Sequence, residues 1–259
     1  MASTKENTAL GLNFTKGDRN NRNLYVGPKD PKTTLRHGVG HFTFSNTYFQ
    51  YEGNYSNNKK HGEGCLVMSN GTRIEGMFNN DELTGPAQIS YANGDVYQGD
   101  LVLGEKSGYG EYSGMWYNYK GNWESNCRQG EGEFIDLSDC VKITGNFNRH
   151  KPHGFCTIQA KTDNMQYAGE LNMGVKSGKG DYESDKERYS GVWKNNKFHG
   201  LGQHLNKVTR LQYIGNFDDG KPDIFPNEFN SKVFKMEKLE EEDLSPVKNM
   251  NQKSVGELK

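Results

Sequence analysis

The chain has 259 residues, of which only 32% are apolar, while 12% are aromatic and 32 are glycine. Its formal net charge is -1, so neither a thick-cored globular fold nor a chain disordered by charge repulsion fits this composition. No stretch approaches the roughly 18 consecutive apolar residues that cross a membrane. We therefore expect a thin, glycine-rich fold that is packed mainly by aromatic rings.

A repeat of 22 to 24 residues runs along most of the chain. Each copy opens with Tyr or Ile, then any residue, then Gly, and a second glycine follows nine residues after the first. The seven copies that keep this spacing begin at Tyr51, Ile74, Tyr97, Tyr119, Ile143, Tyr167 and Tyr189. Imperfect copies begin at Tyr25 and Tyr213. Atypical ends are expected of a stacked array, because a terminal copy has one neighbour only.

Residues alternate with a period of two inside each copy, and this period predicts strands. Tyr119, Gly121 and Trp123 share one face in this pattern. The polar segment 56–61 predicts a hairpin loop. A glycine between two aromatic residues leaves room for a ring to lie flat over the backbone. We therefore predict an all-β fold, an elongated open single-layer antiparallel sheet of about eight to nine stacked hairpins.

The motif of these copies resembles a known repeat. Tyr-x-Gly-x-Trp/Phe, followed by a basic-His-Gly turn and Gly-x-Gly, is similar to the MORN repeat (membrane occupation and recognition nexus), and segments 60–64 and 198–202 match it best. The resemblance covers about residues 25–222, with Leu101 and Leu171 standing where an aromatic residue is expected. It implies a scaffold or adaptor, similar to the array-only proteins of radial spoke heads and other cytoskeletal assemblies.

Three parts are predicted along the chain: an N-terminal arm (1–24) that is disordered or draped, the repeat array (25–222) and a charged tail (223–259). Apolar residues of the tail fall at helical spacing, at Phe229, Val233, Met236 and Leu239. The tail is therefore either a short amphipathic helix, docked on the last repeat or on a partner, or a solvated segment, since isolated helices of this length are marginal in water.

Catalytic and metal-binding motifs are incomplete. The segments 104–107 and 174–177 lack the full phosphate-loop pattern. Zinc needs three or four converging ligands, whereas the histidines that precede a Gly-x-Gly pair are spread along the chain, at His37, His61, His153 and His199. His204 is interpreted as a packing residue. The four cysteines lack paired metal spacing. We expect no cofactor, no metal and no enzyme activity.

The aromatic row is the candidate binding surface. If one face of each ring stays accessible in a single-layer sheet, the row lines a groove of the kind that binds protein partners. The predicted groove residues are Tyr51, Tyr55, Phe78, Tyr97, Tyr119, Trp123, Phe147, Tyr167, Tyr189, Trp193, Tyr213 and Phe217.

The expected function is a non-enzymatic scaffold that binds other proteins of a cytoskeletal, ciliary axonemal assembly, with self-association as an option and no nucleic-acid partner. The expected location is the cytoplasm and cytoskeleton, with the cilium axoneme as the specific site. Two alternatives remain: a peripheral membrane or phosphoinositide-binding module, and a regulatory subunit of an enzyme. A membrane binder needs a polybasic cluster, worth ~1 kcal/mol per residue, and only Lys59–Lys60 and the group Lys29, Lys32 and Arg36 come close.

Overall fold

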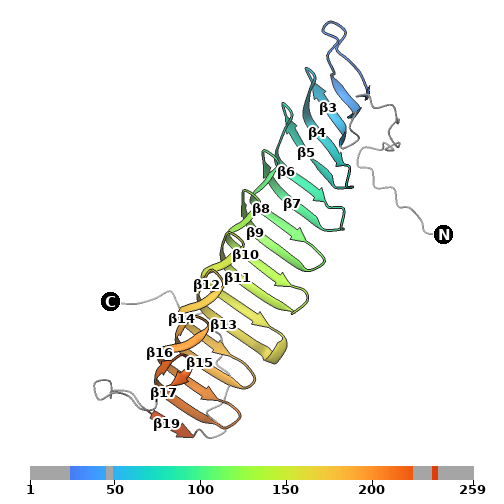
Figure 1. Cartoon of the computed structure of the whole chain (residues 1–259). Coiled ribbons are helices and arrows are strands. Elements are labelled where there is room, and N and C mark those ends of the chain that lie inside the picture. The colour runs from blue at the N-terminus through green and yellow to red at the C-terminus, as the bar shows by residue number, and fades with distance from the viewer. Residues whose placement is uncertain (1–23, 45–48, 224–234, 239–259) are drawn as a thin grey trace, which may run out of the picture. The chain divides into compact units, whose positions relative to one another are not determined.

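The computed structural model describes residues 24–44, 49–223 and 235–238 (Figure 1). The chain divides into two compact units, residues 1–114 and 115–259. Within each unit the described strands form an open antiparallel sheet. All strands but the last of the chain pair with their neighbours within the unit, that last strand pairs with the strand two before it, and the first strand of a unit does not return to its last strand. The prediction of an all-β, open, antiparallel fold is confirmed.

The first unit contains eight described strands. Their bounds are β1 (Leu24–Val26), β2 (Gly38–Thr43), β3 (Phe49–Ser56), β4 (Lys59–Met68), β5 (Arg73–Asn79), β6 (Glu82–Ser90), β7 (Val96–Val102) and β8 (Glu105–Ser113). In the hairpin β3–β4, Tyr51 lies opposite Leu66 and Gly53 lies opposite Gly64. The glycine of the first motif therefore faces the last glycine of Gly-x-Gly across the hairpin.

The second unit repeats this arrangement. Its elements are β9 (Tyr117–Glu124), β10 (Cys127–Asp136), β11 (Val141–Asn148), β12 (Lys151–Ala160), the 3-10 turn η1 (Thr162–Asn164), β13 (Met165–Asn172), β14 (Val175–Glu183), β15 (Glu187–Lys194), β16 (Lys197–Asn206), β17 (Leu211–Asp218), β18 (Lys221–Pro222) and β19 (Lys235–Lys238). Every complete repeat starts within two residues of its predicted position.

The hairpin turns are shorter than the sequence predicted. Only Asn57 and Asn58 connect β3 to β4, and both have positive φ, 50° and 69°. A two-residue turn of this kind matches the twist of the flanking strands. Lys60 and His61, which the sequence placed in a loop, therefore belong to β4. Their side chains become part of the sheet surface.

The last strands correct one prediction about the tail. β19 pairs with β17, and Met236 lies opposite Tyr213. Residues 235–238 are thus a strand, and both the helix and the solvated segment are wrong there, because the edge of β17 offers hydrogen-bond partners that a strand can use. Phe229, Val233 and Leu239 lie outside the described residues, as does the arm up to residue 23. The three-part division of the chain stays a prediction.

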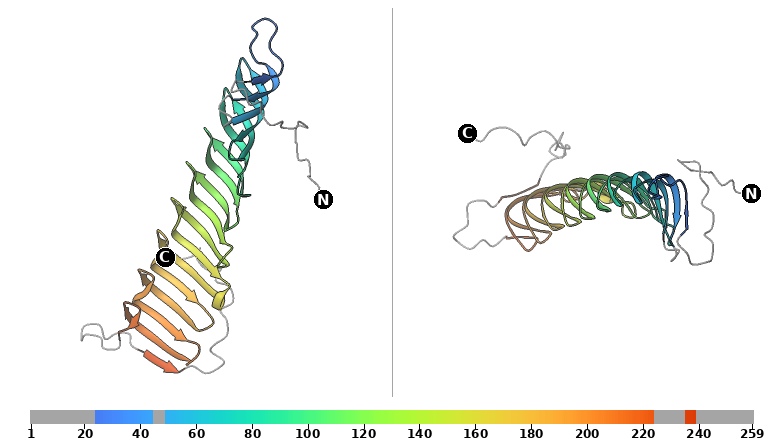
Figure 2. Two further views of the ribbon diagram at one scale, coloured as in Figure 1. Left: turned by 45° about the vertical axis from the view of Figure 1, so that its right-hand side comes forward. Right: turned by 90° about the horizontal axis from the view of Figure 1, so that it is seen from above.

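The strands of each unit lie in one layer (Figure 2). We call the side that carries Tyr51, Gly53 and Tyr55 of β3, and the matching residues of the other repeats, the aromatic face. The other side is the opposite face. No helix in the described part of the chain is long and apolar enough to cross a membrane.

Candidate functional site: the aromatic face

The tyrosine that opens a repeat lies flat on glycine, whereas the repeats that open with Ile74 and Ile143 lack this ring. A Cβ atom added to Gly53 would stand 2.5 Å from both the Cα of Gly64 and the hydroxyl oxygen of Tyr51, so there is no room for a side chain. The Tyr51 hydroxyl donates to the carbonyl oxygen of Asn54 at 3.1 Å. The same bond, to the carbonyl three residues ahead, is made by Tyr97, Tyr119, Tyr167, Tyr189 and Tyr213. Glycine and this bond together orient the ring.

Rings of successive hairpins meet edge to face. In the first unit the Tyr51 centroid lies 5.2 Å from that of Tyr55 and 5.0 Å from that of Phe78. In the second unit Tyr119 lies 5.2 Å from Trp123 and 5.3 Å from Phe147, measured the same way. These are the distances and the geometry that aromatic pairs prefer. Ring packing thus links several hairpins to the next, as the sequence predicted, whereas Leu101 and Leu171 occupy the aromatic position in two repeats.

The predicted groove residues come together on the aromatic face, but none presents an open ring. All twelve are between 0% and 5% exposed: Tyr51, Tyr55, Phe78, Tyr97, Tyr119, Trp123, Phe147, Tyr167, Tyr189, Trp193, Tyr213 and Phe217. Burial raises the pKa of Tyr97 and Tyr189 to about 12. The expectation of accessible ring faces is therefore wrong for this chain, and binding of a protein partner at this face stays a prediction.

The cover comes from the residue two positions before the first glycine of each Gly-x-Gly. The Lys60 Nζ lies 5.5 Å from the Tyr51 centroid. The Lys176 Nζ lies 4.7 Å from the centroids of Tyr167 and Trp193 and 4.8 Å from that of Tyr182. We call this position the lid; from the first described repeat to the last it holds Arg36, Lys60, Leu83, Lys106, Arg128, Pro152, Lys176 and Phe198.

Five of these eight lids are cations. Sequence reasoning missed them because it placed their positions in a loop. The recurring basic residue before the histidine or its substitute was a usable signal, since a cation over ring faces stabilises the packing by about 0.5–2 kcal/mol. Burial lowers the pKa of Lys106 to about 8, against an opposing contribution from Asp95. Burial lowers the pKa of Lys176 as well, and Glu187 opposes it.

The last complete repeat uses a ring as its lid. Phe198 stacks on Tyr189 with centroids 3.8 Å apart and planes inclined by 11°. His204 lies beside it, 5.5 Å between ring centroids, and its Nε2 is 2.8 Å from a carboxylate oxygen of Glu187. That hydrogen bond lowers the pKa of Glu187 in spite of burial. The described residues hold no cluster of three or more His, Cys, Asp or Glu that could bind a metal ion.

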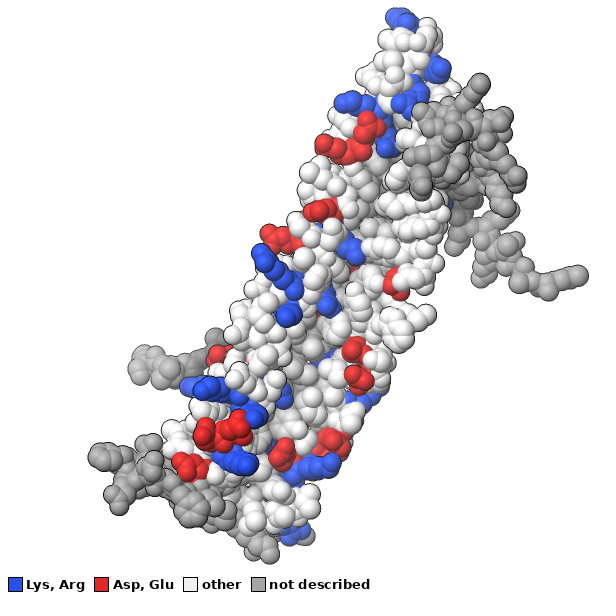
Figure 3. All heavy atoms as spheres, viewed as in Figure 1, with Lys and Arg blue, Asp and Glu red and all other residues white. Residues whose placement is uncertain are grey.

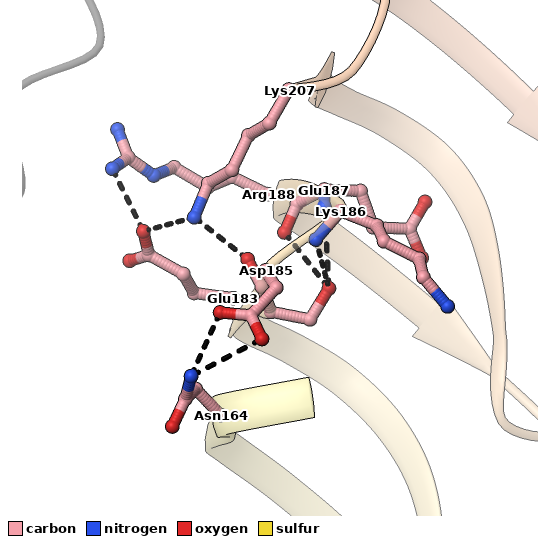
Figure 4. Close-up of polar contacts among 8 residues, drawn as sticks. Asn164, Glu183, Asp185, Lys186, Glu187, Arg188 and Lys207 are labelled. Carbon is pink, nitrogen blue, oxygen red and sulfur yellow. Dashed lines mark hydrogen bonds and ion pairs between the residues drawn. The ribbon is translucent and has the colours of Figure 1, made fainter. Parts of the chain in front are cut away.

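A polar cluster joins the segments that connect successive hairpins in the second unit (Figure 4). Lys207 donates to the Glu183 carboxylate at 2.8 Å and to the Ser184 carbonyl oxygen at 2.7 Å, and Arg188 donates to the same carboxylate at 2.9 Å. Asn164 donates to Asp185 at 2.9 Å. Burial raises the pKa of Glu183, but the bonds from Lys207 and Arg188 outweigh it, so the net shift is downward. The cluster ties one connection to the next.

Comparison with known proteins agrees with the repeated geometry. The MORN repeat family model matches residues 35–47, 51–73, 75–96, 97–118, 144–164, 167–186 and 189–204, together more than half of the chain. Alsin of Mus musculus and alsin of Homo sapiens are each 25% identical to the chain over 179 residues, which is 64% of the chain and 9% of alsin. The chain therefore spans about a tenth of the length of these curated relatives.

Proposed function

Because the chain belongs to the MORN repeat family, which is a structural repeat, we propose that it is a non-enzymatic scaffold that holds proteins of a cytoskeletal assembly together. The observation that carries the proposal is the aromatic face itself. Buried rings fix the backbone, and a lid at a constant position in each hairpin lies over the aromatic face. A surface that is ordered before binding loses little conformational entropy when a partner docks.

The proposed location is the ciliary axoneme, where a rigid array can join neighbouring proteins. Expression of the tagged full chain in ciliated cells tests this. We expect the protein to stay with the axoneme after detergent removes membrane and soluble proteins, and to be released with axonemal complexes at high salt. A protein lost completely in the detergent extract contradicts the axonemal location.

A peripheral membrane module is the second candidate, since several lids are cations. Two features weigh against it. The lid cations lie over rings rather than free in solvent, and on the surface seen in Figure 3 basic and acidic side chains alternate in small groups. Anionic membranes attract clustered basic residues that keep their charge near the surface. Sedimentation with vesicles that contain or lack phosphatidylserine separates the two candidates, and we expect no binding to either.

A further inference from the structure

The cover over each tyrosine does not require a charge. Tyr167 under Lys176 is 1% exposed, and Tyr189 under Phe198 is 0% exposed. Leu83 occupies the lid position in the first unit and is itself buried. An apolar lid therefore shields the ring as well as a cation does. The positive charge of a cationic lid is therefore not needed to bury the ring.

Arg128 is the cationic lid with buried guanidinium atoms that lack a hydrogen-bond partner. Its guanidinium carbon lies 4.6 Å from the Phe134 centroid and 5.2 Å from that of Tyr117, and burial lowers its pKa. The Nε and Nη1 atoms are buried and make no hydrogen bond, and the guanidinium has no carboxylate partner among the described residues. Ring faces offset only part of the desolvation of such a cation. Arg128 as a whole is partly exposed, so a carboxylate that a partner brings to this side chain would offset more.

We propose that Arg128 anchors an acidic, extended segment of a protein partner that lies across the aromatic face of the second unit. The anchor belongs to the repeat that begins at Tyr119, a stretch that the family model leaves unmatched. The proposal rests on the scaffold function proposed above. It specifies the chemistry of the partner that the face selects.

The spacing of the lids defines the segment further. Lys176 is the next cationic lid of the second unit, and Pro152 lies between them. Arg128 and Lys176 begin β10 and β14, which are four strand spacings apart, about 19 Å at ~4.8 Å per strand. An extended peptide covers that distance with about six residues. The matching segment therefore carries two carboxylates about six residues apart.

The probe is a fluorescein-labelled peptide with two Glu-Glu pairs separated by a short Gly-Ser spacer, and its control replaces every Glu with Gln. Anisotropy of either peptide is measured with the full chain at low salt. Arg128→Met keeps an unbranched lid over the rings and removes the charge. Lys142→Met is the matched control, because Lys142 on β11 loses the same charge but pairs with Glu133, at 2.8 Å, on the opposite face. Thermal melting of both variants verifies that they fold.

We expect the Glu peptide to bind and the Gln peptide not to bind. Loss of one charged hydrogen-bonding partner should weaken binding about tenfold in Arg128→Met, with a change of less than about twofold in Lys142→Met. Equal binding of both peptides, equal weakening in both variants, or no binding up to about 1 mM overturns the proposal. Binding of anionic vesicles in place of the peptide, lost in Arg128→Met, also overturns it, in favour of a lipid. Retention of the wild-type chain in axonemes is scored separately, so failure of the acidic anchor and failure of the scaffold function are distinguishable.

Discussion

The repeats that begin at Tyr167 and Tyr189 are neighbours in the second unit and differ in their lids. Lys176 places an ammonium among three rings in the first of them, whereas Phe198 stacks a ring on Tyr189 in the second. Both tyrosines are buried to the same extent, and both donate to a carbonyl three residues ahead at 2.8 Å. The glycines beneath the ring and the hydrogen bond of its hydroxyl are therefore constant between the two repeats, and the residue at the lid position varies.

The two repeats show that the fold requires a cover over the ring, whereas the charge of that cover is an additional property of some repeats. Burying a ring requires a cover of suitable size, and either chemistry provides it. A cationic lid makes the repeat sensitive to pH and adds charge to the face, whereas a phenylalanine lid does neither. Four experiments test this distinction.

The largest effect is expected where the two repeats are alike, at the glycines beneath the tyrosine ring. A Cβ on Gly169 would stand 2.5 Å from the Cα of Gly180 and 2.7 Å from the Tyr167 hydroxyl oxygen. We expect Gly169→Val to lower the free energy of unfolding by about 3 kcal/mol or more, because backbone atoms block the new side chain. Ala168→Val, one residue away on the opposite face, should change it by less than about 0.5 kcal/mol. Urea unfolding measures both, and similar losses would mean that the faces are assigned wrongly.

Truncating the two lids comes next. Phe198→Ala removes a half-buried ring that also lies 4.9 Å from Trp193, centroid to centroid, and should cost about 2–3 kcal/mol. Lys176→Met keeps the length of the side chain and removes a desolvated charge. We expect the free energy of unfolding of that variant to stay within about 1 kcal/mol of the wild type. A larger loss in Lys176→Met than in Phe198→Ala would show that the charge itself supports the fold.

The third experiment uses pH and a cationic lid of the first unit. The pKa of Lys106 is about 8 in the folded chain, below the ~10.4 of an exposed lysine. The unfolded chain therefore binds more protons between these values, and stability rises with pH across that window. From pH 7.5 to pH 9.5 we expect wild type to gain about 1 kcal/mol relative to Lys106→Met, since the partly solvated ammonium realises only part of the full shift. A difference between the two chains that stays constant from pH 7.5 to pH 9.5 contradicts the assignment of this pKa to Lys106.

The smallest effect concerns the polar cluster that joins the same two repeats at their connections. Glu183→Gln weakens the bonds from Lys207 and Arg188 and should cost about 1 kcal/mol at pH 7. Because the folded pKa of Glu183 lies below its usual value, this stability is present above pH ~4.3 and is lost as pH falls through the folded pKa. Glu170→Gln, an exposed carboxylate of β13, is the control. A loss in Glu183→Gln that persists unchanged at pH 3 would exclude the ion pairs as its cause.

The sequence was sufficient for the strands and for the floor of the aromatic face, because Tyr-x-Gly opposite Gly-x-Gly has one sterically possible packing. The sequence did not predict which side chains form the surface of that face. The error arose at the turns: a two-residue turn at Asn57 and Asn58 extends β4 backward and swings Lys60 over the rings, whereas a six-residue loop would have left it in solvent. Turn length depends on backbone twist, which composition alone does not reveal. Met236 was misassigned for a related reason: the helical spacing of the tail was interpreted without considering that the edge of β17 can pair with another strand.

The pairing of the strands from β9 to β17 with their chain neighbours has a mechanical consequence. In the second unit, a load applied at the two ends would detach one hairpin at a time, since none of the described strands from β11 to β16 bridges distant parts of the sheet and shares the force. Each release frees a repeat of 22 to 24 residues, or about 80 Å of extended chain. The hairpins that remain keep their glycines, rings and lid residues in place, and they provide the template on which the released hairpin re-forms. Such a unit yields to tension in discrete, reversible steps, as an extensible tether does.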